Sequence, residues 1–173
     1  MEPITFTPIR RHSRAARKAL PLWMAFRAEI QGNGDENPIA PEADFQRRVN
    51  NQGSRPDMHF DLLCLGKKKM RKTPIGFAHY AVDKGTIGGL IEPNGGVFMG
   101  FYIAPEYRRQ GCARRMFLHC AETLYRDGAK YLYCCPDPVT GEPFWKAMGF
   151  VDSGIVDPDD KLNIFMLKGE THA

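Results

Sequence analysis

Six residues in the second half of the chain combine arginine side chains with a glycine in a pattern suited to binding an anion. They read Arg-Arg-Gln-Gly-Cys-Ala at 108–113, between an apolar run at 96–104 and a segment whose apolar residues recur every three or four positions. That periodicity predicts a helix from about 113, and the run before Pro105 predicts a strand. A glycine-containing loop that opens a helix presents free backbone N–H groups and the positive end of the helix dipole. The arginines add charge, so the pattern predicts a diphosphate-bearing cofactor.

The spacing Arg-x-x-Gly-x-Ala resembles the acyl-CoA-binding loop of the GNAT superfamily of N-acyltransferases. That loop has Gln or Arg, two further residues, Gly, one residue, and then Gly or Ala. The strand end Ile-Ala-Pro-Glu-Tyr at 103–107 is similar to the family's fourth strand. The segment Pro-Phe-Trp-Lys-Ala-Met-Gly-Phe at 143–150 resembles its late helix, which runs into a Gly-Phe turn and the next strand. These resemblances cover residues 75–167 well and the first third of the chain loosely.

The resemblance implies an N-acyltransferase that uses acetyl-CoA or another acyl-CoA as co-substrate and acts on a primary amine. In the family, a splay between the fourth and fifth strands lets backbone groups of the fourth strand bind the pantetheine arm. The diphosphate is expected on the amides of the loop and the first helical turn. The expected cofactor contacts are Phe101, Ile103, Arg108, Arg109, Gln110, Gly111, Cys112, Ala113, Arg114 and, in the late helix, Phe144.

The late helix departs from the family pattern at the place of its usual acid. Direct attack of an amine on a thioester needs a base, a group that polarises the carbonyl, and an acid for the leaving thiolate. Family members often supply the acid with a tyrosine, where this chain has Trp145. An indole N–H does not transfer its proton at a useful pKa. Either another group protonates the thiolate, or coenzyme A leaves with electrostatic help alone.

Two tyrosines on predicted strands, Tyr102 and Tyr133, are the candidates for the acid, although tyrosine is also an ordinary strand residue. Candidates for the base are Asp137, which ends the fifth strand, Glu92, which precedes the fourth, and His79 on the third. Each has a structural alternative, since Asp before Pro is a typical turn starter. A chain of water molecules could carry the proton instead.

Adjacent cysteines at 134 and 135 could suggest a covalent acyl-enzyme. A nucleophilic cysteine needs a nearby base and an electropositive setting. No histidine lies close to Cys134 or Cys135 in the sequence. We interpret both as small buried apolar residues.

Length and composition predict one domain over residues 1–173, with a fold of the α+β class. The resemblance implies a central mixed, mostly antiparallel sheet with a splay between strands 4 and 5 and helices on both faces. Strands are predicted near 4–9, 59–65, 75–82, 131–135 and 164–167, and helices from Ser13 and over 41–51. Pro21 either kinks the first helix or restarts it.

No apolar stretch approaches the ~20 residues of a membrane helix, and the start lacks the organisation of a secretory signal. Membrane association is therefore not expected. Five cysteines, an odd number, argue against a disulfide framework and for a cytoplasmic location. No Cys/His cluster has zinc-site spacing, so no metal is expected.

The net charge of +4 is concentrated in two basic clusters, at 10–18 and at 67–72. Neither is interleaved with aromatic residues, and no helix-turn-helix or zinc-finger pattern accompanies them. We interpret the first as the polar face of a helix and the second as a hairpin tip, and expect no nucleic-acid partner. Two alternatives stay open: an acetyltransferase directed at RNA or the ribosome, and a GNAT-fold module that holds acyl-CoA without turnover.

Carboxylates gather around the loop at 31–41, which in this fold usually borders the acceptor site. They are Glu29, Asp35, Glu36, Glu42 and Asp44. Such a cluster favours a cationic acceptor such as a polyamine, an aminoglycoside or a lysine-like amine. The alternative is an ordinary solvated loop. The predicted partner is a small-molecule amine, and the chain is expected to be a monomer or homodimer.

Overall fold

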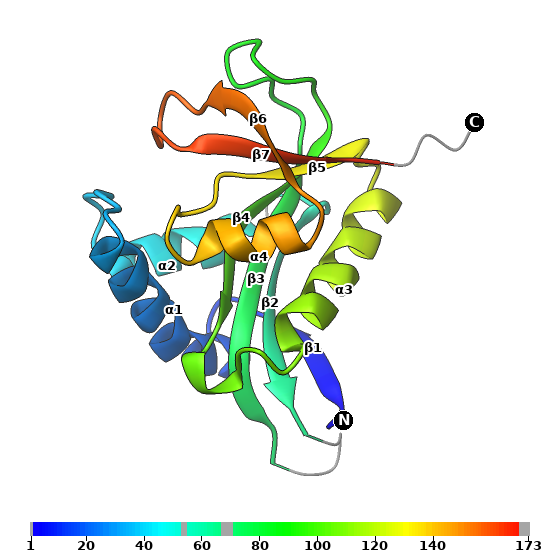
Figure 1. Ribbon diagram of the computed structural model, residues 1–173. Helices are drawn as coiled ribbons and strands as arrows, with labels where there is room; N and C mark the ends of the chain where they lie inside the picture. The colour runs from blue at the N-terminus through cyan, green and yellow to red at the C-terminus, as the bar shows by residue number, and fades with distance from the viewer. Residues whose placement is uncertain (1, 53–54, 67–70, 170–173) are drawn as a thin grey trace.

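A seven-stranded sheet with helices on both faces forms the protein, seen in a computed structural model that describes residues 2–52, 55–66 and 71–169 (Figure 1). In chain order the elements are β1 (Ile4–Pro8), α1 (Arg14–Gly32), α2 (Pro41–Asn51), β2 (Met58–Leu65), β3 (Thr73–Asp83), β4 (Gly95–Ile103), the short 3-10 helix η2 (Pro105–Tyr107), α3 (Cys112–Arg126), β5 (Tyr131–Cys134), α4 (Gly141–Ala147), β6 (Val151–Val156) and β7 (Asn163–Lys168). The strand order is β1-β2-β3-β4-β5-β7-β6. Among the described strands, β4 and β5 pair in parallel and all other pairs are antiparallel. The predicted α+β fold with a mixed, mostly antiparallel sheet is confirmed.

The ladder between β4 and β5 covers only the first part of β4. It joins Gly95 to Tyr131 and ends where Phe98 faces Cys134, whereas β4 continues to Ile103. Close approach of the two strands requires glycine at the paired end, because a Cβ on Gly96 would lie 2.7 Å from the side chain of Leu132. Strand β5 ends at Cys134, so beyond Phe98 β4 has no strand partner on that side. The predicted splay between strands 4 and 5 is present.

Each face of the sheet has its own apolar core. Helices α1 and α2 cover one face and α3 the other, to the left and right of β2–β4 in Figure 1. Helix α1 begins at the predicted N-cap, where the Ser13 hydroxyl accepts a hydrogen bond from the amide of Ala16 at 3.0 Å. The helix runs through Pro21, which lies on its exposed side. Trp23, fully buried, then anchors α1 to the sheet.

Two parts of the chain differ from or extend the sequence prediction. Residues 151–156 form β6, an edge strand that sequence patterning did not delimit, because most of its side chains are exposed and give no alternating apolar signal. Of the predicted basic hairpin tip at 67–72, residues 67–70 lie outside the described residues. Among the helices that the structure describes, none is long and apolar enough to span a membrane.

A buried ion network fixes α1, α2 and the loop between them. Arg27 and Asp44, each 1% exposed, form an ion pair of 2.8 Å, and Arg27 also donates to the carbonyl of Ile39 at 2.8 Å. The second oxygen of Asp44 accepts from Arg47 at 2.8 Å and Arg48 at 3.2 Å. Burial by itself would raise the pKa of Asp44, but the hydrogen bonds and charges of these arginines hold it below its usual value. Asp44 therefore organises α2 and is not exposed to an acceptor.

We expect Asp44→Ala to lower the free energy of unfolding by about 3–5 kcal/mol, because it leaves the buried Arg27 without its counter-charge. Urea unfolding at neutral pH measures this loss. Glu42→Ala is the matched control, since Glu42 is an exposed carboxylate in the first turn of the same helix. Its substitution should cost less than about 1 kcal/mol. Equal losses in the two variants would contradict the structural role of Asp44.

Candidate active site

The loop between β4 and α3 holds two residues in left-handed backbone conformations. Arg109 has φ +62°, and Gly111, the N-cap of α3, has φ +82°. The positive φ of Gly111 favours glycine, and a Cβ there would meet no atom within 4 Å, so the space above the loop is open. No side chain caps the first turn of α3. The N–H groups of Cys112, Ala113 and Arg114 therefore form an uncapped, positively polarised helix start.

Arg108 holds this loop against α1. Its Nε donates to the carbonyl of Ile103 at 2.8 Å, and its Nη2 forms an ion pair of 2.7 Å with Glu29. Its guanidinium also lies over the ring of Tyr102, 5.4 Å from the centroid. The side chain of Gln110 likewise turns back to the backbone of η2. Two exposed guanidinium groups remain next to the helix start, those of Arg109 and Arg114.

On the open edge of β4, the carbonyls of Met99 and Ile103 accept hydrogen bonds from arginine side chains. The backbone groups of Phe101, which lies between them, do not take part in these bonds. Ala104 donates to Ile75 on β3, so by the alternation of an antiparallel ladder Ile103 and Phe101 direct their N–H and C=O groups away from β3. The carbonyl of Ile103 accepts from Arg108, and that of Met99 accepts from Arg48 at 3.4 Å. The backbone of Phe101 faces the splay without a protein partner among the described residues.

An aromatic cluster borders the splay. The ring of Phe101 stacks on that of Phe144 at 5.3 Å and meets Trp145 edge-on at 5.0 Å. Trp145 is 5% exposed and packs against Phe98 and Phe150. The residue at the family's acid position is thus the centre of a hydrophobic core. The sequence predicted that Phe101 and Phe144 both contact the cofactor. In the structure their rings stack on each other.

The two candidate tyrosines lie in different cores. Tyr102 is 4% exposed and packs in the α1/α2 core against Phe77. Tyr133 is 3% exposed and donates to Asp83 at 2.5 Å. Burial raises the pKa of both hydroxyls, and the carboxylate of Asp83 raises that of Tyr133 further. Neither proton is released easily at neutral pH.

The three candidate bases are also separated. Asp137 accepts hydrogen bonds from the amides of Val139 and Gly141 at the start of α4, and from Asn33 at the end of α1 at 2.9 Å. Although burial favours its protonation, hydrogen bonds led by that of Thr140 lower its pKa. Asp137 therefore holds α4 to α1. Glu92 is exposed in the loop before β4.

His79 is a buried neutral side chain. It is 3% exposed, its Nδ1 lies 3.0 Å from a nitrogen of Arg48, and its Nε2 has no hydrogen-bond partner in the described part of the chain. Burial, helped by the charge of Arg48, lowers its pKa to about 3. Arg48 must be the donor, so Nδ1 accepts. A histidine with this pKa is a weak base near neutral pH.

Arg48 is a site residue that sequence reasoning did not identify. From α2 it reaches His79 on β3 and Met99 on β4, while Asp44 fixes its Nε and the ring of Trp23 lies 5.0 Å beneath it. These contacts place a guanidinium beside the first unpaired residues of β4. A lone arginine on a polar helix carries no sequence signal for such a position.

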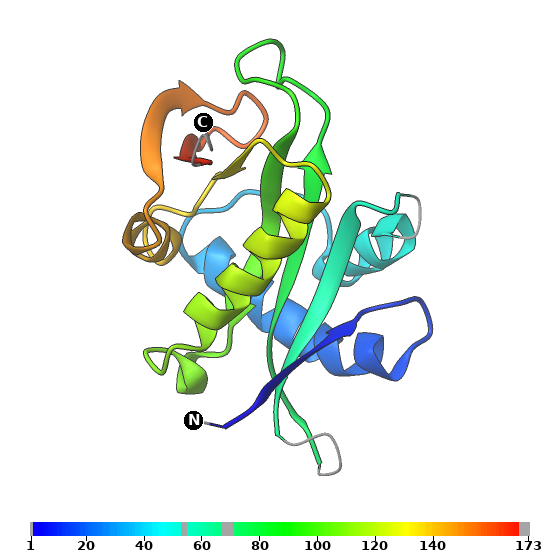
Figure 2. The ribbon, with the colours of Figure 1, turned by 90° about the vertical axis from the view of Figure 1, so that its right-hand side faces the viewer.

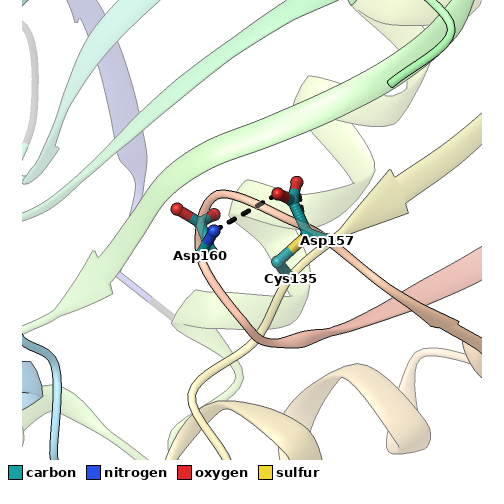
Figure 3. Close-up of side chains that lie close together, drawn as sticks. All are labelled: Cys135, Asp157 and Asp160. Atoms are coloured by element: carbon teal, nitrogen blue, oxygen red, sulfur yellow. Dashed lines mark hydrogen bonds between the residues drawn. The ribbon is translucent and has the colours of Figure 1, made fainter. Parts of the chain in front are cut away.

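A negatively charged corner lies where the loop after β6 meets the end of β5 (Figure 3). One ligand atom each from Cys135, Asp157 and Asp160 lies within 4.8 Å of the others. Burial raises the pKa of Cys135 to about 12, with help from Asp157, so the thiol keeps its proton. Burial followed by the charges of Asp157, Asp159 and Asp35 raises the pKa of Asp160. Asp35, which the sequence predicted near the acceptor site, thus contributes to the negative potential at Asp160.

The comparisons with known proteins agree with this geometry. A sequence profile of the acetyltransferase (GNAT) family matches residues 24–150. The chain belongs to the GNAT acetyltransferase family. No curated protein sequence matches it.

Solved structures similar to this GNAT chain share its fold at low sequence identity. An acetyltransferase from Thermus thermophilus is 18% identical, with a TM-score of 0.71, and the match covers 98% of this chain and 100% of that one. The PaiA N-acetyltransferase from Thermoplasma acidophilum, in complex with coenzyme A, is 15% identical, with a TM-score of 0.67 and coverage of 96% and 99%. AAC(6')-Iy, in complex with the bisubstrate analogue CoA-S-monomethyl-acetylneamine, is 14% identical, with a TM-score of 0.60 and coverage of 89% and 95%.

We expect His79 to make the stability of the fold pH-dependent. Its pKa is about 3 in the folded chain and near 6.5 when unfolded, so between these values the unfolded state binds the extra proton. The free energy of unfolding therefore falls as the pH decreases through this window, by up to about 1.4 kcal/mol per pH unit from this residue. His79→Asn keeps a hydrogen-bond acceptor for Arg48 but has no titrating imidazole. Its free energy of unfolding should therefore fall less steeply as the pH decreases.

Urea unfolding between about pH 7 and pH 5 measures the two slopes. The matched control is His12→Asn, because His12 is exposed and has the positive φ that Asn tolerates. It should keep the slope of the unmodified protein. Identical slopes in all three proteins would mean that His79 is not a neutral buried group.

Proposed function

We propose that this protein transfers an acetyl group from acetyl-CoA to a primary amine of a small cationic molecule, by direct attack of the amine on the thioester. The observation that carries the proposal is the unpaired backbone of Phe101 on the open edge of β4, in the same strand-loop-helix unit as the uncapped start of α3. A β-like pantetheine arm can pair with the first, and a diphosphate can bind the second.

The residues of the loop and of the splay offer groups that suit each part of an acyl-CoA. The open space over Gly111 and the amides of the first turn of α3 would take the diphosphate, with Arg109 and Arg114 adding charge. Arg108 would position the loop without contacting the diphosphate, because its side chain donates to Ile103 on β4 and to Glu29 on α1. Phe101 and Phe144 would form an apolar wall beside the pantetheine arm.

Proton transfer in this proposal does not use the late helix. The attacking amine becomes positively charged as its bond to the acetyl carbon forms, and it must lose a proton as the C–S bond breaks. That proton can pass to the departing thiolate through water, which balances the reaction without a side-chain acid. Trp145 would then exclude water from the apolar wall, consistent with its burial.

The negative corner supports a cationic acceptor. Asp157 and Asp160 on the loop after β6 and Asp35 on the loop after α1 raise the local negative potential at one end of the splayed strands. A second ammonium group of the acceptor would bind there while the first amine meets the thioester. The acetylneamine part of the analogue held by AAC(6')-Iy is an amine-bearing ligand of this general kind.

One observation favours a second candidate, a GNAT-fold module that holds acyl-CoA without turnover. Trp145 fills the place of the tyrosine that family members often use as the acid, and its neighbours are hydrocarbon rings. Release of free thiol on mixing the protein with acetyl-CoA and a panel of amines separates the two candidates. An enzyme releases thiol in proportion to the amine, whereas a binding module releases none.

We further propose a cytoplasmic location, supported by five unpaired cysteines.

Gly111→Glu should abolish cofactor binding. The substitution places a carboxylate at the proposed diphosphate site and strains a backbone with φ +82°. Calorimetric titration with acetyl-CoA and then coenzyme A should show binding to the unmodified protein that weakens at least tenfold, or about 1.4 kcal/mol, in the variant. Gly154→Glu is the matched control, with φ +76° and equally open space, and should bind normally. Absence of binding to the unmodified folded protein would refute the proposed function.

Asp160→Asn should lower kcat/KM for diaminobutane by about tenfold and for butylamine by less than about twofold. The reason is that only the diamine presents a second ammonium group to the negative corner. Steady-state thiol release with both amines measures the ratio. Glu122→Gln, at an exposed carboxylate of α3, should change neither value. An equal decrease in kcat/KM for both amines would show that Asp160 does not bind the second ammonium group.

A further inference from the structure

A hollow of about 340 Å³ lies under the start of α1, against β1 and β2. It is at the edge of the sheet, separated from β4 by β2 and β3. Figure 2 shows the start of α1 and the loop that leads into α3 on different sides of the molecule. The hollow is therefore distinct from the candidate active site. Its lining residues are Thr7, Arg14, Ala15, Lys18, Leu62, Cys64, Arg71 and Lys72.

The two basic clusters of the sequence meet in this hollow. Arg14 and Lys18 are one helical turn apart and share a face of α1. Arg71 and Lys72 come from the other cluster, just before β3. Sequence reasoning placed the first pair on a solvated helix face and the second pair at a hairpin, more than fifty residues apart. The fold brings all four cations around one concave surface.

Among the residues that the structure describes, no anionic side chain balances these four charges. The lining contains no Asp or Glu, and none of the four cations has a hydrogen bond or ion pair with a carboxylate of the described residues. Like charges held close together raise the free energy of the folded state. An anion in the hollow would remove that repulsion and gain charge-assisted hydrogen bonds.

The floor of the hollow is apolar. Leu62 is 1% exposed and Cys64 is 3% exposed, and Ala15 closes the side toward α1. Burial raises the pKa of the Cys64 thiol, and the ammonium groups of Lys18 and Lys72 partly oppose that increase. Lys18 and Lys72 line the same hollow as Cys64. The hollow joins a cationic rim to an apolar base.

We propose that this hollow binds the phosphate group of a small phosphate ester, with the organic part of the ester resting on Leu62 and Cys64. Two guanidinium and two ammonium groups match the charge and the several acceptor oxygens of a phosphate. The volume is in the range of small-molecule sites. An extended RNA strand fits less well, because the lining has no aromatic ring on which a base could stack.

Backbone amide NMR can test the proposal with phenyl phosphate as the probe. Phenyl phosphate should shift the amide signals of Thr7, Ala15 and Cys64 in a saturable way, while phenol should not. Any binding to the acyl-CoA site is read separately from the amides of Gly111 and Ala113. A failure of the proposed acetyltransferase function therefore leaves this test unaffected.

The double variant Lys18→Ala, Lys72→Ala should bind phenyl phosphate at least about tenfold more weakly at the hollow, because each lost charge-assisted contact is worth about a factor of ten. The matched control is Lys84→Ala, Lys130→Ala, which removes the same charge from exposed positions outside the hollow. Its affinity should be unchanged. The amide spectrum of each variant shows directly that it is folded.

Three results would overturn the proposal. The first is the absence of saturable shifts at the hollow. The second is an equal loss of affinity in the two double variants, which would show that only net charge matters. The third is that vesicles containing phosphatidic acid, or a single-stranded oligoribonucleotide, shift these signals while phenyl phosphate does not. That result would assign the surface to a membrane or to nucleic acid.

Discussion

The incomplete pairing of β4 with β5 is the constraint on which the rest of the structure depends. A strand in the middle of a sheet that loses its partner after Phe98 exposes backbone donors and acceptors that must be satisfied in another way. The protein covers two of the exposed carbonyls, those of Met99 and Ile103, with arginines from other elements. Phe101, between them, keeps an open backbone with which an extended ligand could pair, as proposed above.

The hydrogen bond from Arg48 to the carbonyl of Met99 is linked to the packing of α1 and α2. Arg48 can reach Met99 only because α2 is fixed by the buried Asp44, which in turn holds Arg27 and the loop after α1. An unpaired charge at such depth would be costly, so the arginines and the carboxylate have to be buried together. The network that stabilises α1 and α2 is therefore the same one that shapes the edge of the splay.

Sequence patterns predicted most of the strands and helices, the glycine-containing loop before α3 and the family, because these depend on local periodicity and on glycine at a fixed place. They could not predict which arginine of the loop, Arg108 or Arg109, is exposed and available to bind an anion. Arg108 and Arg109 are neighbours in one motif, yet one is held by Glu29 and the other is exposed, and only the position of α1 decides this. Asp137 likewise has the sequence context of a turn and of a base, and only the structure reveals its hydrogen bonds to α4 and α1.

The same reasoning explains how Trp145 can replace a tyrosine without loss of the fold. An aromatic side chain at this point of α4 closes the core between Phe98 and Phe150, and an indole fills that space at least as well as a phenol. A hydroxyl group here would need a polar partner among hydrocarbon rings, or an open path to the splay. With tryptophan the apolar rings are in contact from Phe150 to Phe101, so in the proposed reaction the charges would come from the surrounding loops and from the acceptor itself.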